Sequence, residues 1–265
     1  MPPNSTRILK QWGLLEHMDS LSDRPVGFVF RSYRDGKFLS SVDLAACSEG
    51  RYDHPYLHTH RADYHDVLVE EVRRLGGKVQ LNSEVIGIDF AKPAIHIKGL
   101  PDITPDLIIG ADGVKSVSRE HLLERADPPR TSGDMAYRCI VRTEKIKHNP
   151  GLEELLQSHN LHYWIGPEQH VVCYRLRAGN LFNIVIACTD DLPETANMAA
   201  ADIQELRDRV NGWDPKLKAL IDLAEDGGKG RLMRVDEMET WTHPLGKFAL
   251  LGDACHATLP YLYVI

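Results

Sequence analysis

Two segments of this sequence, DLIIGADGVKSVSR (residues 106–119) and FALLGDACHATLPY (residues 248–261), follow one pattern. Each begins with an apolar run, continues through glycine and aspartate, and then starts a helical pattern. Continuous apolar runs of this length are typical of buried parallel strands, so residues 107–109 are expected to form an inner strand. Together the two segments predict an α/β fold with two similar strand–turn–helix corners.

The two turns carry residues that suit a nucleotide-type cofactor. In open α/β sheets, ligands bind beyond the carboxyl ends of the strands. Glycine there lets the backbone approach a ligand, and a carboxylate accepts hydrogen bonds from ribose or ribityl hydroxyls. The helix that follows offers free N–H groups to a phosphate. One such turn alone would be an ordinary connection, but two copies favour a cofactor.

The remaining pattern changes from α/β to antiparallel β and back. Residues 4–20 predict a helix with Ile8, Leu9, Trp12 and Leu15 on its buried face. Residues 26–42 read as a hairpin around Asp35–Gly36, and residues 60–75 as a helix that Gly76–Gly77 ends before two strands. Alternating residues from 135 to 189 predict an antiparallel sheet, and residues 200–225 one or two helices. This order suggests two domains, the second inserted into the first.

Composition narrows the classes of function. The chain has 265 residues and a formal net charge of -7, which argues against a nucleic-acid partner because phosphate neutralisation needs a basic surface. Its five cysteines form no CxxC pair and predict reduced residues in a cytoplasmic protein. No transmembrane run or signal peptide is evident, and the sequence leaves the oligomeric state open. The histidines of DHPYLHTH (residues 53–60) are not expected to bind a metal, because no further ligands cluster with them.

Several segments together resemble the class A FAD-dependent monooxygenases, with the salicylate hydroxylase-like aromatic hydroxylases as the most similar branch. DLIIGADGVKSVSR is similar to that family's DG motif, and ALLGDACHATLPY to its GD motif. HRADYHDVLVEEV (residues 60–72) resembles the HRxDLHxxL helix. PNSTRILKQWGLL (residues 3–15) and MAYRCIV (residues 135–141) resemble two further segments of the family. The resemblance runs through nearly the whole chain in the correct order.

The resemblance implies a set of FAD-binding residues. The arginine of the HRxDL helix, which contacts FAD in the family, corresponds to Arg61, whose alternative is a surface charge. The GD aspartate that holds the ribityl chain corresponds to Asp253, and the DG aspartate to Asp112, which could also cap the following helix. The matching motif positions complete the implied cofactor-binding set with Gly113, Gly252, His256 and Pro260.

The resemblance also implies a substrate, a reductant and a reaction. The family reduces FAD with NAD(P)H, forms a flavin C4a-hydroperoxide with O₂, and hydroxylates an aromatic or similar small organic substrate. The antiparallel block would form the floor of the substrate pocket, with Arg138 stabilising an anionic substrate and Tyr174 donating a hydrogen bond. A strand-edge salt bridge for Arg138 and a half-buried aromatic role for Tyr174 are the structural alternatives.

The sequence departs from the family pattern at both ends. It contains no GxGxxG, and after Pro260 the expected PxxGQGA is absent, so that the pattern is lost at Tyr263. We therefore expect a Rossmann-like FAD-binding domain, incomplete in its first βαβ unit, with an inserted antiparallel-sheet substrate domain. Residues 1–127 would form the partial FAD-binding domain, with the hairpin 25–43 joining the substrate domain of residues 128–240, and residues 241–265 would return to the first domain. Two alternatives stay open: a shortened, non-catalytic form unable to hold FAD, and an FAD-dependent epoxidase of an isoprenoid substrate.

Overall fold

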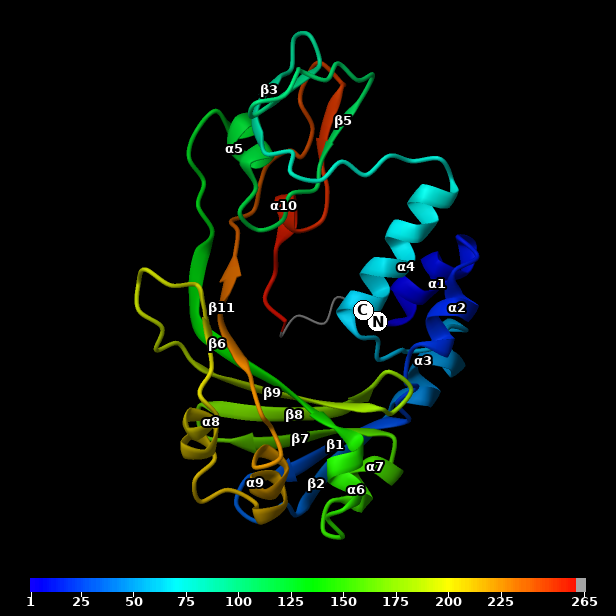
Figure 1. The fold of residues 1–265 in the computed structure, drawn as a ribbon, viewed down its shortest axis with the longest axis vertical. Coiled ribbons are helices and arrows are strands. Elements are labelled where there is room, and N and C mark those ends of the chain that lie inside the picture. Colours follow the sequence, from blue (N-terminus) through cyan, green and yellow to red (C-terminus); the bar gives the residue numbers. More distant parts are fainter. Residues whose placement is uncertain (261–265) are drawn as a thin grey trace. The chain divides into compact units, whose positions relative to one another are not determined.

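The computed structural model describes residues 1–260 and groups its elements into two compact units (Figure 1). Unit 1 comprises Met1–Gly77 and Asp134–Arg231. Unit 2 comprises Lys78–Gly133 and the described residues from Leu232 onward. The chain thus leaves unit 1 for unit 2, returns to it, and leaves it again. The fold is mixed α/β, as the sequence predicts.

Unit 1 is built on one large sheet. The sheet has eight strands in the order β10-β11-β6-β9-β8-β7-β1-β2. Their bounds are β1 Gly27–Ser32, β2 Phe38–Asp43, β6 Arg130–Arg142, β7 Asn160–Gly166, β8 Gln169–Leu176, β9 Leu181–Thr189, β10 Met198–Ala200 and β11 Gly228–Arg234. The predicted hairpin therefore forms the β1–β2 edge of this sheet. The β1–β7 pair is parallel, which the sequence did not indicate.

One face of the sheet carries the main hydrophobic core. Alternate residues of the strands, among them Tyr137, Trp164 and Ile184, are fully or almost fully buried on that face. The four helices that pack there lie on one side of the sheet in Figure 1. They are α6 Thr143–Lys147, α7 Glu153–Gln157, α8 Ile203–Arg209 and α9 Pro215–Ile221. Residues 200–225, expected to form one or two helices, form two, since α8 ends at Arg209 and α9 begins at Pro215.

The remaining helices of unit 1 lie at its N-terminal end. They are α1 Pro3–Gln11, α2 Leu15–Ser20, α3 Leu44–Tyr52 and α4 Arg61–Arg74. α1, α2 and α4 share a core that contains Leu9, Met18 and Val67, whereas Leu44 of α3 packs with Leu161 and Tyr163. The predicted helix 4–20 is therefore two helices, and its predicted buried face is only partly correct. Leu9 is fully buried and Leu15 packs against the same core, but Ile8 is 40% exposed and Trp12 57% exposed. The break near Gly13 rotates α2 relative to the single helical face that a continuous periodicity assumes.

Unit 2 is smaller and holds both acidic turns. Its elements are β3 Val85–Asp89, β4 Ala94–Ile97, β5 Ile108–Gly110, α5 Val117–Leu123, β12 Phe248–Leu250 and α10 Asp253–His256. Its core is formed by Ile108, Phe248, Leu250, Ala254 and Cys255. Where two strands were expected after α4, the described residues contain one, β3, before the next turn.

The inner strand expected at residues 107–109 corresponds to β5, which belongs to a two-stranded sheet within the described residues. β5 pairs with β12 in parallel, as the apolar runs predict. However, Ile108 is buried whereas Ile109 is 48% exposed, so β5 buries only one of its faces. Among residues 1–260, no helix is both long enough and apolar enough to cross a membrane.

Candidate functional site

The two acidic turns follow neighbouring parallel strands. Ile108 pairs with Phe248 and Gly110 with Leu250, so β5 and β12 end side by side. The N–H of Leu251 donates to the carbonyl of Gly110 at 2.9 Å and extends the pairing by one step. The loops that carry Asp112 and Asp253 therefore leave the same edge of one small sheet. This edge is where parallel strands present ligand-binding groups.

Asp112 caps the helix that follows its turn. Its carboxylate accepts hydrogen bonds from the Ser116 hydroxyl at 2.5 Å and from the Ser118 N–H at 2.9 Å. Ser116 is the N-cap residue of α5 and accepts from the Arg119 N–H. Burial raises the pKa of Asp112, but these hydrogen bonds outweigh burial and leave the pKa below its usual value. The carboxylate is therefore ionised and held in place, with Gly113 next to it in the loop.

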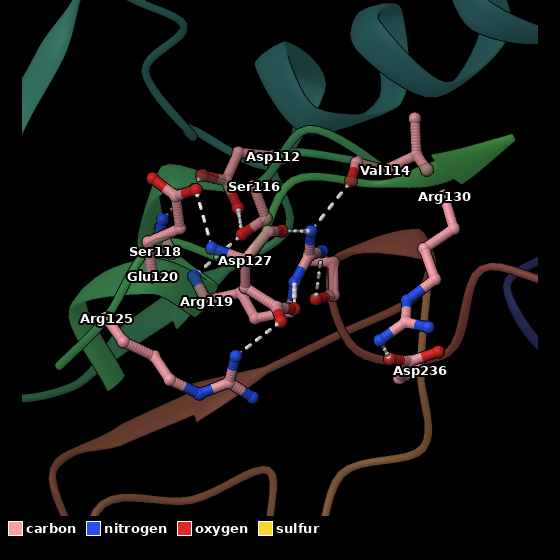
Figure 2. A network of polar contacts seen from close by, with 11 residues as sticks. Asp112, Val114, Ser116, Ser118, Arg119, Glu120, Arg125, Asp127, Arg130 and Asp236 are labelled. Atoms are coloured by element: carbon pink, nitrogen blue, oxygen red, sulfur yellow. Dashed lines mark hydrogen bonds and ion pairs between the residues drawn. The ribbon is translucent and has the colours of Figure 1, made fainter. Parts of the chain in front are cut away.

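Arg119 connects the two turns and was not singled out from the sequence. Its side chain is fully buried and donates to a carboxylate oxygen of Asp127 at 2.9 Å. It also donates to three backbone carbonyls: those of Val114 and Asp127 at 2.9 Å, and that of Ala254 at 3.0 Å (Figure 2). The available signal was its place three residues after Ser116, at the end of the first quoted segment.

The Asp253 turn presents an open backbone and a free carboxylate. Gly252 has φ 62° and ψ −140°, and a Cβ built on it would meet nothing within 4 Å. Its carbonyl accepts from the N–H groups of Cys255 and His256. Asp253, the first residue of α10, is exposed, and no hydrogen bond or ion pair reaches its carboxylate from residues 1–260. An open glycine and an unused acceptor fit the polyol chain of a flavin nucleotide.

A cavity of about 460 Å³ lies beside this turn. His256 lines it, with its ring 5.1 Å from that of Trp241. Asp236, Glu237 and Glu239 line the same cavity, and Asp236 forms an ion pair with Arg130 (Figure 2). Three carboxylates make this cavity a poor place for phosphate groups. Pro260 is exposed at the end of the described chain, and the departure from the motif at Tyr263 lies outside it.

Arg61 and its helix belong to unit 1. Arg61 is the first residue of α4 and is exposed. In the same first turn, Asp63 accepts two hydrogen bonds from the guanidinium of Arg177, at 2.6 and 2.8 Å. A carboxylate suits a helix N-terminus and a cation does not. The convergence of Arg61 with the two turns of unit 2 stays a prediction.

Arg138 and Tyr174 lie on the sheet face opposite the main core. Arg138 pairs with Val185, and Val185 with Val172, so these residues share a face, and Tyr174 is two positions along β8. Arg138 is exposed, and no ion pair to it occurs in the part of the chain that the structure describes, so the strand-edge salt bridge is not seen. Tyr174 is half-buried, with its ring 4.4 Å from that of His58.

His58 is the central member of a buried histidine segment. It is 6% exposed, and burial, assisted by the nearby N-terminal ammonium, lowers its pKa to about 3. Ring nitrogens of His54, His58 and His60 are buried without a hydrogen-bond partner among the described residues. No group of three metal-ligating side chains occurs within residues 1–260. His58 is therefore a neutral side chain on the same face as Tyr174.

Comparison with known proteins relates the chain to FAD-dependent monooxygenases. Over 265 residues, 99% of its length, it is 37% identical to FAD-dependent monooxygenase OpS4 of Beauveria bassiana. It is 27% identical over 269 residues to the 6-hydroxynicotinate 3-monooxygenase of Pseudomonas fluorescens. The chain is similar to FAD-dependent monooxygenases over nearly its whole length. It spans 62% of the first relative and 66% of the second, and no protein-family model matches it.

Solved structures show that this chain has a known fold. A salicylate hydroxylase in a substrate complex matches 98% of the chain with a TM-score of 0.81 and 24% identity, and the chain covers 65% of that structure. The structure of CtdE with FAD and a substrate matches 98% of the chain with a TM-score of 0.84 and 21% identity, with 65% of that structure covered. At these identities the likeness concerns the fold. The resemblance inferred from the motifs is thereby confirmed.

Proposed function

We propose that this chain binds FAD and hydroxylates a small aromatic substrate, with NAD(P)H as the reductant and O₂ as the oxidant. One observation carries the proposal: the two glycine–aspartate turns leave adjacent parallel strands and are joined by one buried arginine. Asp253 and Gly252 would hold the polyol chain, with Asp112 and Gly113 beside them and Arg61, His256 and Pro260 as further cofactor contacts. When bound, FAD supplies the electron transfer and the activation of O₂. One oxygen atom enters the substrate and the other leaves as water.

The substrate class we propose is a hydroxylated aromatic carboxylate. Relatives of the chain are named for 6-hydroxynicotinate, 3-amino-4-hydroxybenzoate and 3-hydroxybenzoate, each a ring with a hydroxyl and a carboxylate. Arg138 supports this class because it is an exposed cation on the face that carries Tyr174. A planar guanidinium pairs with a carboxylate through two parallel hydrogen bonds. Tyr174 would donate to a ring oxygen of the substrate.

Binding of FAD is tested first. The chain is purified in the presence of FAD and desalted, and its visible spectrum is recorded. A flavin band that stays with the protein supports the proposal. A colourless, folded protein would contradict it and would support the alternative of a form unable to hold FAD.

Substrate class is tested with pairs of compounds. Oxidation of NADH and of NADPH is followed with 3-hydroxybenzoate and 6-hydroxynicotinate, and with phenol and hydroxypyridine as carboxylate-free counterparts. We expect Arg138→Gln to raise KM for the carboxylates about tenfold, because a charge-assisted pair is lost, and to leave the neutral compounds unchanged. Arg142→Gln, an exposed arginine at the end of the same strand, is the matched control. Turnover of isoprenoid alkenes alone would favour the epoxidase alternative. A cytoplasmic location and the absence of a nucleic-acid partner stay predictions.

A further inference from the structure

Arg119 is a charged side chain that unit 2 buries completely. Its exposed fraction is 0%, and its ionic partner Asp127 is also largely buried. Removing a guanidinium from water is costly, so its donors must find acceptors inside the protein. Arg119 meets this condition with four acceptors, and three of them are backbone carbonyls. A residue kept for charge pairing alone would not need three carbonyls.

Those three carbonyls belong to three different segments. The carbonyl of Val114 lies in the Asp112 loop and that of Asp127 follows α5 (Figure 2). The carbonyl of Ala254 lies in α10. α10 is four residues long, so its carbonyls have little helix beyond them to donate a hydrogen bond. Arg119 supplies that donor at Ala254. Ala254 is the residue next to Asp253.

We propose that Arg119 is a positioning residue that locks the Asp112 loop and the Asp253 turn into one arrangement and thereby sets the affinity for flavin. The second part rests on the proposed function, in which Asp253 holds the polyol chain of FAD. Arg119 acts through backbone carbonyls and leaves the Asp253 carboxylate unpaired. Fixing the Ala254 carbonyl restrains the residue next to Asp253 and so limits the directions of that carboxylate before a cofactor arrives, which lowers the entropic cost of binding.

Arg125 provides a matched control. It forms an ion pair with the other carboxylate oxygen of Asp127 at 3.1 Å, but it is 63% exposed and contacts none of the three carbonyls. Arg125→Gln therefore removes a cationic partner of the same carboxylate but leaves the hydrogen bonds from Arg119 to the three carbonyls in place. Arg119→Lys retains the charge, but one ammonium group cannot replace a planar guanidinium that donates to three segments.

The first readout is hydrogen exchange in the flavin-free protein. In Arg119→Lys, we expect the amides of Cys255 and His256 to exchange at least tenfold faster, because α10 loses its anchor. The amides of β3 and β4 in the same unit should stay within twofold of the wild type, as should all amides in Arg125→Gln. Unchanged exchange rates at Cys255 and His256 would overturn the proposed positioning role of Arg119. An equal increase in the exchange rates of β3 and β4 would also overturn it, because it would signal general destabilisation.

The second readout is flavin affinity. Arg119→Lys should weaken FAD binding at least tenfold, and Arg125→Gln should stay within twofold of the wild type. Faster exchange with unchanged FAD affinity would overturn the link to the cofactor. A wild-type protein that binds no FAD would instead contradict the proposed function, while the exchange comparison would still decide whether Arg119 holds the turn. If Arg119→Lys fails to fold, Asp127→Asn, which leaves Arg119 facing a neutral acceptor, should shift both readouts in the same direction.

Discussion

Asp112 and Asp253 occupy similar sequence patterns but have different surroundings. Asp112 accepts hydrogen bonds from Ser116 and Ser118 and caps α5. Asp253 is exposed and has no partner among the described residues, and the space around the neighbouring Gly252 is open. Helix capping thus accounts for the first carboxylate without a ligand, whereas the second is exposed and unused. The stronger functional expectation falls on Asp253.

At this scale, Asp253→Ala should lose flavin affinity with little loss of stability. Hydrogen bonds to a charged group contribute about 1.5–3 kcal/mol, so FAD affinity should fall roughly 10- to 100-fold. The melting temperature of the flavin-free protein should stay near that of the wild type, because the side chain is exposed and unpaired. Fluorescence titration with FAD measures the first quantity. Asp106→Ala, an exposed aspartate just before β5, is the control, and equal effects of the two substitutions would contradict the role of Asp253.

His58 predicts a pH dependence of stability. Its pKa is about 3 in the folded protein and near 6.5 in the unfolded chain, so below about pH 6.5 the unfolded state binds more protons. Stability is therefore lost as the pH falls from about 6.5 towards 3, at most by about 1.4 kcal/mol per pH unit from this residue. Urea unfolding between pH 7 and pH 4 should show a shallower loss in His58→Phe than in the wild type. Parallel curves would show that His58 is accessible to protons in the folded state.

The ends of individual helices are easier to predict from the local sequence than their buried faces. Gly76–Gly77 ends α4 as predicted, with the Gly76 N–H bonded to the carbonyl of Arg73 and the Gly77 N–H to that of Val72. The buried faces were harder to predict, because Ile8 and Trp12 belong to the predicted buried face of residues 4–20 and are exposed. Helix termini depend on a few neighbouring residues, whereas a buried face depends on which distant element covers it.

Replacing each of two glycines by alanine should change the free energy of unfolding in opposite directions. Gly76 has φ 84°, so Gly76→Ala should cost about 1 kcal/mol through left-handed strain even though no atom lies within 4 Å of the added Cβ. Gly50 lies inside α3 without a positive φ and with equally open surroundings. Gly50→Ala should stabilise the protein by roughly 0.5–1 kcal/mol. Chemical denaturation measures both variants, and a destabilising Gly50→Ala would count against this account of the two helices.

For the molecule as a whole, the two units should respond separately to damage. Asp214 in unit 1 is 3% exposed, caps α9, and accepts the indole N–H of buried Trp164 at 2.7 Å. Asp214→Ala should cost about 2–4 kcal/mol, because a cap is lost and a buried donor is left unpaired. Asp202 is exposed, so Asp202→Ala removes only the cap of α8 and should cost about 1 kcal/mol.

Hydrogen exchange locates the effect of Asp214→Ala. Amides of β7, β8 and β9 should lose protection, while those of β5 and β12 should retain it, because the latter belong to a unit with its own core. Equal loss of protection in both units would mean that the molecule unfolds as one cooperative block.

The sequence alone indicated the resemblance to FAD-dependent monooxygenases, the mixed α/β fold, and the two glycine–aspartate turns. It could do so because apolar periodicity, glycine and helix-capping residues act over a few neighbouring positions. Only the tertiary structure decided that β5 and β12 are adjacent and parallel, that β1 pairs with β7, and that Arg119 is buried between the two turns. These features join residues more than a hundred positions apart. What selects them is the cost of leaving distant apolar surfaces and polar groups without partners, and no local stretch of sequence records that cost.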